Sequence, residues 1–111
     1  MKDSTDDQLF AKAIKLITDN LDNRDFIKDQ QLAAVMLCSN RTVYSQFNKR
    51  VGMPPKAYTR HLQMLRVKQL LINSPELSLY EVSARCGLTY YAMAKQFKRS
   101  LGITPAQARQ R

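Results

Sequence analysis

The stretch that decides the fold is SNRTVYSQFNKRVGMPP, residues 39–55. A related stretch, TYYAMAKQFKRSLGITP, fills residues 89–105, so the chain repeats itself at an offset of 50 residues. We call residues 30–58 the first copy and residues 80–108 the second copy; they share five identities in 29 positions. The identical pairs are Ala34 and Ala84, Gln46 and Gln96, Phe47 and Phe97, Gly52 and Gly102, and Pro55 and Pro105. These are apolar, cap and turn positions, so the repeat predicts two related modules that hold a common ligand at two places.

The apolar residues in and before the first copy have helical spacing, without sustained alternation. We expect helices over residues 6–21, 29–36 and 39–51, with the polar run 22–25 ending the first. Ser39 is expected to cap the third helix, and Gly52 to end it in the left-handed conformation. The residues expected to be buried on this helix are Val43, Phe47 and Val51.

A long connector helix is expected between the copies. Pro54 and Pro55 suit its first turn, and Ser74-Pro75 stops it after Asn73. Its second half is apolar on more than one side, which predicts packing on both flanks. A rod of about 18 helical residues is roughly 27 Å long, and major-groove segments on one face of DNA recur roughly every 34 Å. The connector therefore suits a monomer that reaches two adjacent groove segments.

The second copy predicts the same order of elements. Ser78 and Glu81 form a capping box for a short helix that ends at Cys86. Gly87 makes the turn, and Thr89 caps a helix to Leu101 that Gly102 and Pro105 end. The residues expected to be buried on it are Met93, Phe97 and Leu101. The predicted fold is all-α, with helix-turn-helix subdomains at residues 6–53 and 74–111 joined by the connector at residues 54–73.

The positive charge of the chain is concentrated in the repeated part. The formal net charge is +9, but residues 1–29 carry a net −2 and residues 30–111 a net +11. In the latter range the only acids are Glu76 and Glu81. This distribution indicates a polyanionic partner.

The second helix of each copy is the candidate for insertion into a DNA major groove. Once its apolar stripe is buried, the face left over carries hydrogen-bonding and basic side chains and no acid. Arg and Asn near a helix N-terminus suit contacts to base edges, and basic residues one or two turns later suit phosphates. The predicted base contacts are Asn40, Arg41, Tyr44 and Ser45 in the first copy and Tyr90, Tyr91 and Lys95 in the second; the predicted phosphate contacts are Asn48, Lys49, Lys98 and Arg99.

The ordered set of motifs resembles the double helix-turn-helix DNA-binding domain of the AraC/XylS family of transcription regulators. The matching residues are Leu32-Ala33, Ser39 to Phe47, Gly52 to Pro55, Leu70-Leu71, Val82, Phe97-Lys98-Arg99, Gly102, Thr104-Pro105 and Arg109. The resemblance implies sequence-specific binding of double-stranded DNA. Residues 20–26 and 39–44 are also similar to output domains of hybrid two-component regulators of Bacteroides-type bacteria.

The chain departs from the family pattern at four places. Leu37 stands where the family usually has glycine, and Gln63 where it usually has arginine. Ser45 replaces a residue that is often basic. From Gly87 to Phe97 there are ten steps, where the family normally has eleven, so the second turn is expected to lack one residue. We therefore expect the first copy to carry more of the base specificity.

A second function class fits the same helices: a protein–protein interaction module that docks an acidic partner. An enzyme, a cofactor site and a metal site are not predicted. His61 is the only histidine, Cys38 and Cys86 lack metal-ligand spacing and read as small buried residues, and the acids at 19, 22, 25 and 29 lack the glycine and glutamate of a calcium loop.

The expected location is cytoplasmic. No apolar run is long enough to span a bilayer, no signal peptide is present, and isolated cysteines suit a reducing compartment. Besides double-stranded DNA, the candidate partners are RNA polymerase and a longer sensor–regulator chain of which this domain is a part.

Overall fold

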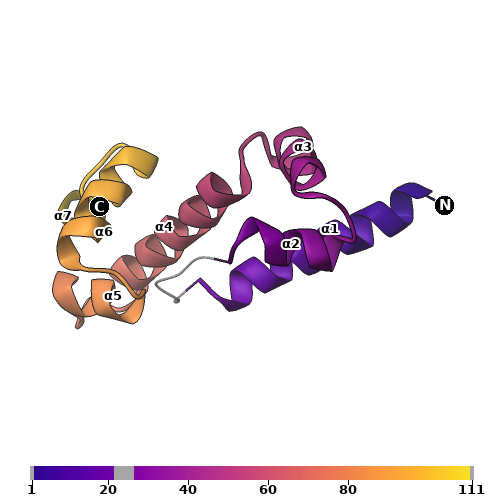
Figure 1. Cartoon of the computed structure of the whole chain (residues 1–111). Coiled ribbons are helices and arrows are strands. Elements are labelled where there is room, and N and C mark those ends of the chain that lie inside the picture. Colours follow the sequence, from indigo (N-terminus) through magenta and orange to yellow (C-terminus); the bar gives the residue numbers. More distant parts are fainter. Residues whose placement is uncertain (1, 22–26, 111) are drawn as a thin grey trace. The chain divides into compact units, whose positions relative to one another are not determined.

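The computed structural model describes residues 2–21 and 27–110, and every regular element within them is a helix (Figure 1). The helices are α1 (Lys2–Asp19), α2 (Asp29–Met36), α3 (Asn40–Val51), α4 (Pro55–Asn73), α5 (Leu79–Arg85), α6 (Tyr90–Leu101) and α7 (Pro105–Gln110). The predicted all-α class is confirmed. The chain divides into two compact units, with the boundary within α4 between Thr59 and Arg60. The predicted limits at residues 53 and 73, which set α4 apart as its own region, stay a prediction.

The first unit is built around Phe47 of α3, whose side chain is fully buried. Its ring lies 4.9 Å from that of Phe10 on α1 and 6.1 Å from that of Tyr58 in the first turns of α4, measured between centroids. Around it the helices bury the apolar stripes that the sequence shows: Ala13, Ile17, Leu32, Met36 and Val43. This packing fixes which face of α3 points inward, and therefore which face is left exposed.

The turn between α2 and α3 is held by backbone and side-chain caps. Leu37 has a left-handed backbone, with φ of 55°, and the Cys38 N–H donates to the Ala33 carbonyl at 3.1 Å. Ser39 then caps α3, because its Oγ accepts from the Thr42 N–H at 3.2 Å. At the other end Gly52 has φ of 75°. The bounds of α2, the cap at Ser39 and the left-handed stop at Gly52 are as predicted.

Helix α1 differs from its predicted range at both ends. It begins at Lys2 and ends at Asp19 instead of spanning residues 6–21. It ends early because Asn20 turns back on it: the Asn20 side chain donates to the Leu16 carbonyl at 2.8 Å and its backbone N–H to Ile17 at 3.1 Å. The break predicted at 22–25, and the resemblance noted for 22–26, lie outside the described residues.

The second unit has a continuous apolar core formed by α4, α5, α6 and α7. Its buried members are Met64, Val67, Leu71, Leu77, Val82, Cys86, Met93, Phe97 and Ala108. Two polar side chains complete it. Gln63 is 2% exposed and its Nε2 donates to the Cys86 carbonyl at 3.2 Å. The Arg109 guanidinium donates to the carbonyls of Leu71 at 3.2 Å and Ser74 at 3.3 Å, and so caps the C-terminal end of α4.

The caps of the second unit repeat those of the first. Ser78 and Glu81 form the predicted capping box of α5, and the Thr89 side chain accepts from the Ala92 N–H at 3.1 Å at the start of α6. Gly102 ends α6 with φ of 79°. Val51 and Leu101, predicted to be buried, are only half-buried. They are the last residues before these glycine caps, where the helix leaves the core.

Helix α7 was not predicted, because Gly102 and Pro105 were expected only to end α6. The Thr104 backbone N–H donates to Gln107 Oε1 at 2.9 Å, and the Gln107 N–H donates back to Thr104 Oγ1 at 3.1 Å. This reciprocal cap starts a new helix. Pro105 is the counterpart of Pro55, so both copies end by opening a helix at the same proline.

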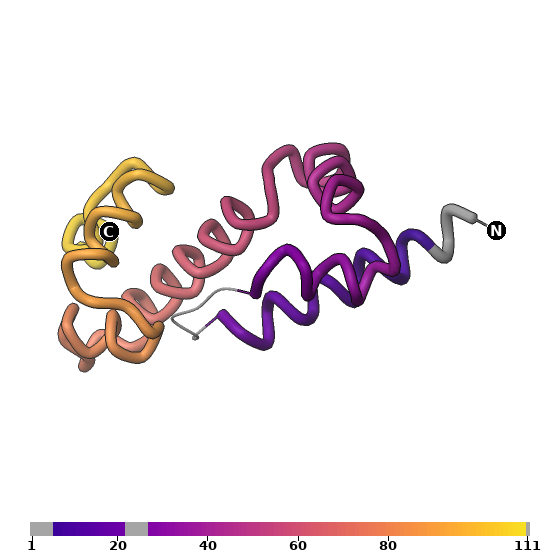
Figure 2. Tube along the Cα trace, in the orientation of Figure 1, coloured from indigo at the N-terminus to yellow at the C-terminus, as the bar shows by residue number. Residues whose placement is uncertain are grey.

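Helix α4 is continuous across the boundary between the units (Figure 2). Its buried residues in the second unit form one stripe, including Met64, Val67 and Leu71. Leu65 and Ile72 are 37% and 53% exposed. The expectation that α4 is covered on both flanks is therefore wrong for these two side chains.

Candidate nucleic-acid interface

The outward face of α3 gathers the six residues that the sequence predicts there. Val43 and Phe47 point into the core, and the residues at the complementary positions are all exposed: Asn40, Arg41, Tyr44, Ser45, Asn48 and Lys49. Because a helix turns about 100° per residue, Arg41, Tyr44, Ser45, Asn48 and Lys49 share one face, whereas Asn40, seven residues before Phe47, is exposed because it is the first residue of the helix. Asn40 and Arg41 stand at its N-terminal end, directly after the Ser39 cap, and Lys49 lies in the last turn.

The Tyr44 hydroxyl has an acidic neighbour from another helix. Asp29 stands at the start of α2, and the hydrogen bond between its carboxylate and Tyr44, together with its negative charge, raises the pKa of Tyr44 above its ordinary value. The outward face of α3 itself carries no acid, as predicted, and Asp29 belongs to α2.

The outward face of α6 is less uniform. Tyr91, Lys95, Lys98 and Arg99 are exposed, and Tyr91 is 75% exposed. Tyr90, however, is half-buried against the core of the second unit and its ring stacks on that of Tyr80, with centroids 4.4 Å apart and planes 25° apart. Of the three predicted base contacts in this copy, Tyr90 is therefore the one whose ring is already partly covered by the protein.

The two turns that precede these helices are equally long. Leu37 in the first and Gly87 in the second both have a positive φ, and each is followed two residues later by the N-cap, Ser39 or Thr89. The second turn is therefore as long as the first, and ten steps separate Leu37 from Phe47 just as they separate Gly87 from Phe97. Both helices start from a formed cap that fixes their N-terminal residues.

Not every basic residue of the repeated part is free to meet a polyanion. Arg50 donates to Asp7 on α1 at 2.6 Å and to Gln46 at 3.0 Å, and its guanidinium lies 5.2 Å from the centre of the Phe10 ring. Arg109 caps α4. The predicted phosphate contacts Lys49, Lys98 and Arg99 are exposed, and none of them forms an ion pair with another described residue. Their charges are therefore not used in ion pairs within the described part of the fold.

Two neighbours of the interface were missed from the sequence. Tyr80 lies on α5, and its ring meets that of Tyr90 on α6, ten residues later in the sequence. Asp29 enters the sequence analysis only as one of the acids that lack the features of a calcium loop. Neither residue belongs to a motif within a recognition helix. Each lies on the preceding helix, α2 or α5, and could be found only by asking which residues of that helix approach the recognition helix.

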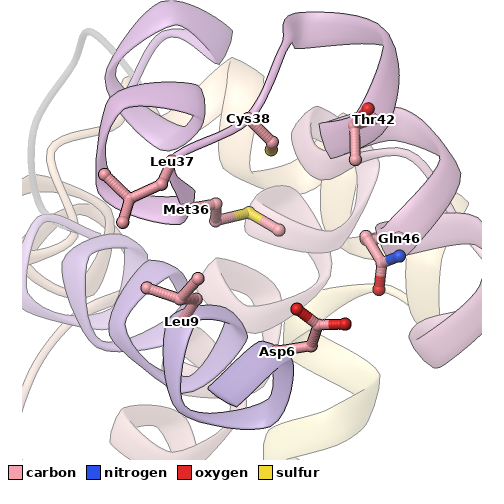
Figure 3. Close-up of a pocket in the computed structure, with 7 residues that line it drawn as sticks. All are labelled: Asp6, Leu9, Met36, Leu37, Cys38, Thr42 and Gln46. Atoms are coloured by element: carbon pink, nitrogen blue, oxygen red, sulfur yellow. The ribbon is translucent and has the colours of Figure 1, made fainter. Parts of the chain in front are cut away.

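A pocket of about 190 Å³ lies in the first unit, on the side of α3 where Thr42 and Gln46 stand (Figure 3). Its lining residues are Asp6, Leu9, Met36, Leu37, Cys38, Thr42 and Gln46.

Burial raises the pKa of the Cys38 thiol, so this thiol is protonated at neutral pH. Cys38 is half-buried and Cys86 fully buried, so the prediction of small buried residues is confirmed only for Cys86.

Within residues 2–21 and 27–110, no three His, Cys, Asp or Glu side chains come together in a way that could hold a metal ion. Over the same residues, every helix is too short or too polar to cross a bilayer.

Comparison with known proteins places these helices in a family. Residues 32–111 match the model of a family described as a helix-turn-helix domain. The DNA-binding domain of AdpA, a global transcriptional factor solved in complex with a target DNA, is 29% identical; the match covers 90% of this chain and 88% of that one, with a TM-score of 0.75. No curated protein matches the chain significantly in sequence.

Two further solved structures share the fold. A transcriptional regulator from Chromobacterium violaceum with an AraC-type DNA-binding domain is 21% identical, covering 94% of this chain and 91% of that one, with a TM-score of 0.81. The C-terminal domain of the two-component response regulator yesN from Fusobacterium nucleatum is 24% identical, covering 92% and 98%, with a TM-score of 0.76. Because the family model matches most of the length of this chain, the chain belongs to the AraC-type helix-turn-helix family.

Proposed function

We propose that this chain is the sequence-specific, double-stranded-DNA-binding domain of a transcription regulator, with α3 and α6 as its two recognition helices. One observation carries the proposal. Two helices, 50 residues apart and started by equivalent caps, expose basic and hydrogen-bonding faces at the same helical positions. Its family is one of DNA-binding regulators and not of enzymes, and a relative 29% identical to it was solved on its target DNA.

The roles of the side chains follow from their positions. Asn40 and Arg41, at the N-terminal end of α3, are proposed to contact base edges, since both side chains can form bidentate pairs. Tyr44 and Ser45, exposed on the same face, extend this contact. In α6, Tyr90, Tyr91 and Lys95 are the proposed base contacts. Asn48, Lys49, Lys98 and Arg99 lie one or more turns further and are proposed to contact phosphates.

We further propose that one chain occupies two adjacent major-groove segments, so that no dimer is needed. Both recognition helices belong to one polypeptide and are joined through α4. The expected footprint is about 16–20 base pairs, from two groove segments one helical turn apart. Protection of a single half-site, or a strict requirement for two chains, would contradict this part of the proposal.

The cellular setting is a separate proposal. The sequence similarity to output domains of hybrid regulators, and the fold shared with the C-terminal domain of a response regulator, support a place at the output end of a two-component system in the cytoplasm. RNA polymerase and a longer sensor–regulator chain stay predicted partners.

Affinity for duplex DNA at graded salt is the test of the main proposal. If about six cations neutralise phosphates, log K falls against log salt with a slope near −5. The complementary experiment is a selection from random duplexes, which should return one preferred sequence. A flat salt dependence with no selected site would overturn DNA binding and favour the module that docks an acidic protein.

A further inference from the structure

Two aromatic rings meet at the point where the second copy is expected to enter DNA. Tyr80 is the second residue of α5 and Tyr90 the first of α6, and their stacked rings lie 4.4 Å apart. We call these two residues the tyrosine pair. Both stand on capped helix ends, and Tyr90 is held against the core, so the pair is fixed before any ligand arrives.

The pair also exposes apolar surface that the fold does not use. Tyr80 is 69% exposed although it packs on Tyr90, and the neighbouring Tyr91 is 75% exposed. The residues at the same places in the first copy are Gln30 and Asn40, which are exposed and polar. The two copies therefore carry different side chains at equivalent positions: two amides in the first and two aromatic rings in the second.

The location suggests what the aromatic surface meets. In a helix-turn-helix the N-terminal residues of the second helix contact base edges, while the first helix crosses the backbone. Tyr80 lies on the first helix, α5, and Tyr90 is the first residue of the second helix, α6, so the tyrosine pair has one member at each of these places. The major groove has one apolar group on an unmodified base, the 5-methyl of thymine, and apolar side chains read thymine through it. An aromatic face offers this methyl group a rigid contact at little entropic cost.

We propose that the second copy recognises a thymine methyl group through the tyrosine pair, with Tyr80 as the residue that orients Tyr90. This rests on the proposed function and deepens it, since it names the ligand group at the second recognition helix. Tyr80 thereby becomes a specificity-determining residue that lies outside the recognition helix itself.

Replacement of thymine by deoxyuridine tests the proposal, because it removes the methyl group and leaves base pairing unchanged. In the preferred duplex of the wild-type chain, each thymine is replaced singly. We expect one position in the half contacted by α6 to lose about fourfold in affinity, which is what burial of one methyl group is worth. The Tyr80→Ala variant should bind the thymine and deoxyuridine duplexes equally. Tyr80→Phe, which keeps the ring, should retain the difference.

Gln30→Ala is the matched control in the first copy and should leave the ratio between the two duplexes unchanged. Thermal unfolding of each variant shows whether the fold is kept, and Tyr80→Gln, which introduces the residue of the first copy, serves if Tyr80→Ala unfolds. The proposal is overturned if no thymine in that half is sensitive to the methyl group, if the selected half contains no thymine, or if the ratio survives in Tyr80→Ala. These results leave DNA binding itself intact, whereas failure of the proposed function would abolish specific binding to every duplex.

Discussion

Leu37 and Gly87 occupy equivalent positions 50 residues apart, and both have a left-handed backbone, with φ of 55° and 72°. Such a φ is free of strain for glycine but costs a residue with a Cβ about 1–2 kcal/mol. Leu37 is also 78% exposed, so its side chain regains little by burial. The left-handed conformation at position 37 is therefore better suited to glycine, the residue at the equivalent position 87, than to leucine.

We expect Leu37→Gly to raise the free energy of unfolding by up to about 1 kcal/mol, the strain relieved less the extra entropy of glycine in the unfolded chain. Urea denaturation measures the change. Leu37→Ala, which keeps a Cβ, should give no such gain, and Gly87→Ala should destabilise by about 1 kcal/mol. Stabilisation by Leu37→Ala as large as that by Leu37→Gly would show that the Leu37 side chain, and not its left-handed backbone, lowers the stability.

The Arg109 guanidinium has a structural role within the fold, although by charge alone Arg109 resembles the basic residues proposed to contact DNA. It donates to two carbonyls at the end of α4, which lie 38 and 35 residues earlier in the chain. Arg109→Met keeps the apolar stem and removes both donors, so we expect it to lower the free energy of unfolding by about 1–3 kcal/mol. Lys98→Met, at an exposed position, is the control and should change stability by less than about 0.5 kcal/mol. Equal stability of the two variants would contradict the capping role.

The comparison of these residues shows what could be predicted from the sequence. The ends of α3 and α6 were predictable because Ser39, Thr89, Gly52 and Gly102 act on the backbone within a few residues of themselves, and the Ser78–Glu81 capping box marks the start of α5 in the same way. Thr104 and Gln107 form a cap of the same local kind, which predicts a helix after Thr104. Treating Pro105 only as the end of α6 leaves this helix out. Contacts between distant residues, such as Arg109 with Leu71 and Tyr90 with Tyr80, leave no local pattern and appear only once the helices pack.

The exposed cations of the recognition helices should control affinity without controlling sequence preference. Lys98→Ala removes one proposed phosphate contact, so we expect it to weaken binding to all duplexes alike and to make the salt slope shallower by about one unit. Fluorescence anisotropy with preferred and random duplexes at graded salt measures both effects. Arg109→Met, whose charge is used within the fold, should leave the slope unchanged if the variant is folded. A loss confined to the preferred duplex would instead make Lys98 a base contact.

The first copy is expected to carry more of the base specificity than the second. Arg41 can form a bidentate pair with guanine, whereas Tyr91 at the equivalent position of α6 offers one hydroxyl and a ring. Arg41→Ala should therefore cost about 1–3 kcal/mol on the preferred duplex and relax the preference at one or two base pairs. Tyr91→Ala should have a smaller effect on preference. Competition binding on single-position variants of the preferred duplex measures both. If Arg41→Ala leaves the preference unchanged while Tyr91→Ala alters it, the roles assigned to the two copies are reversed, because the bidentate chemistry of the first copy would then not be reading bases.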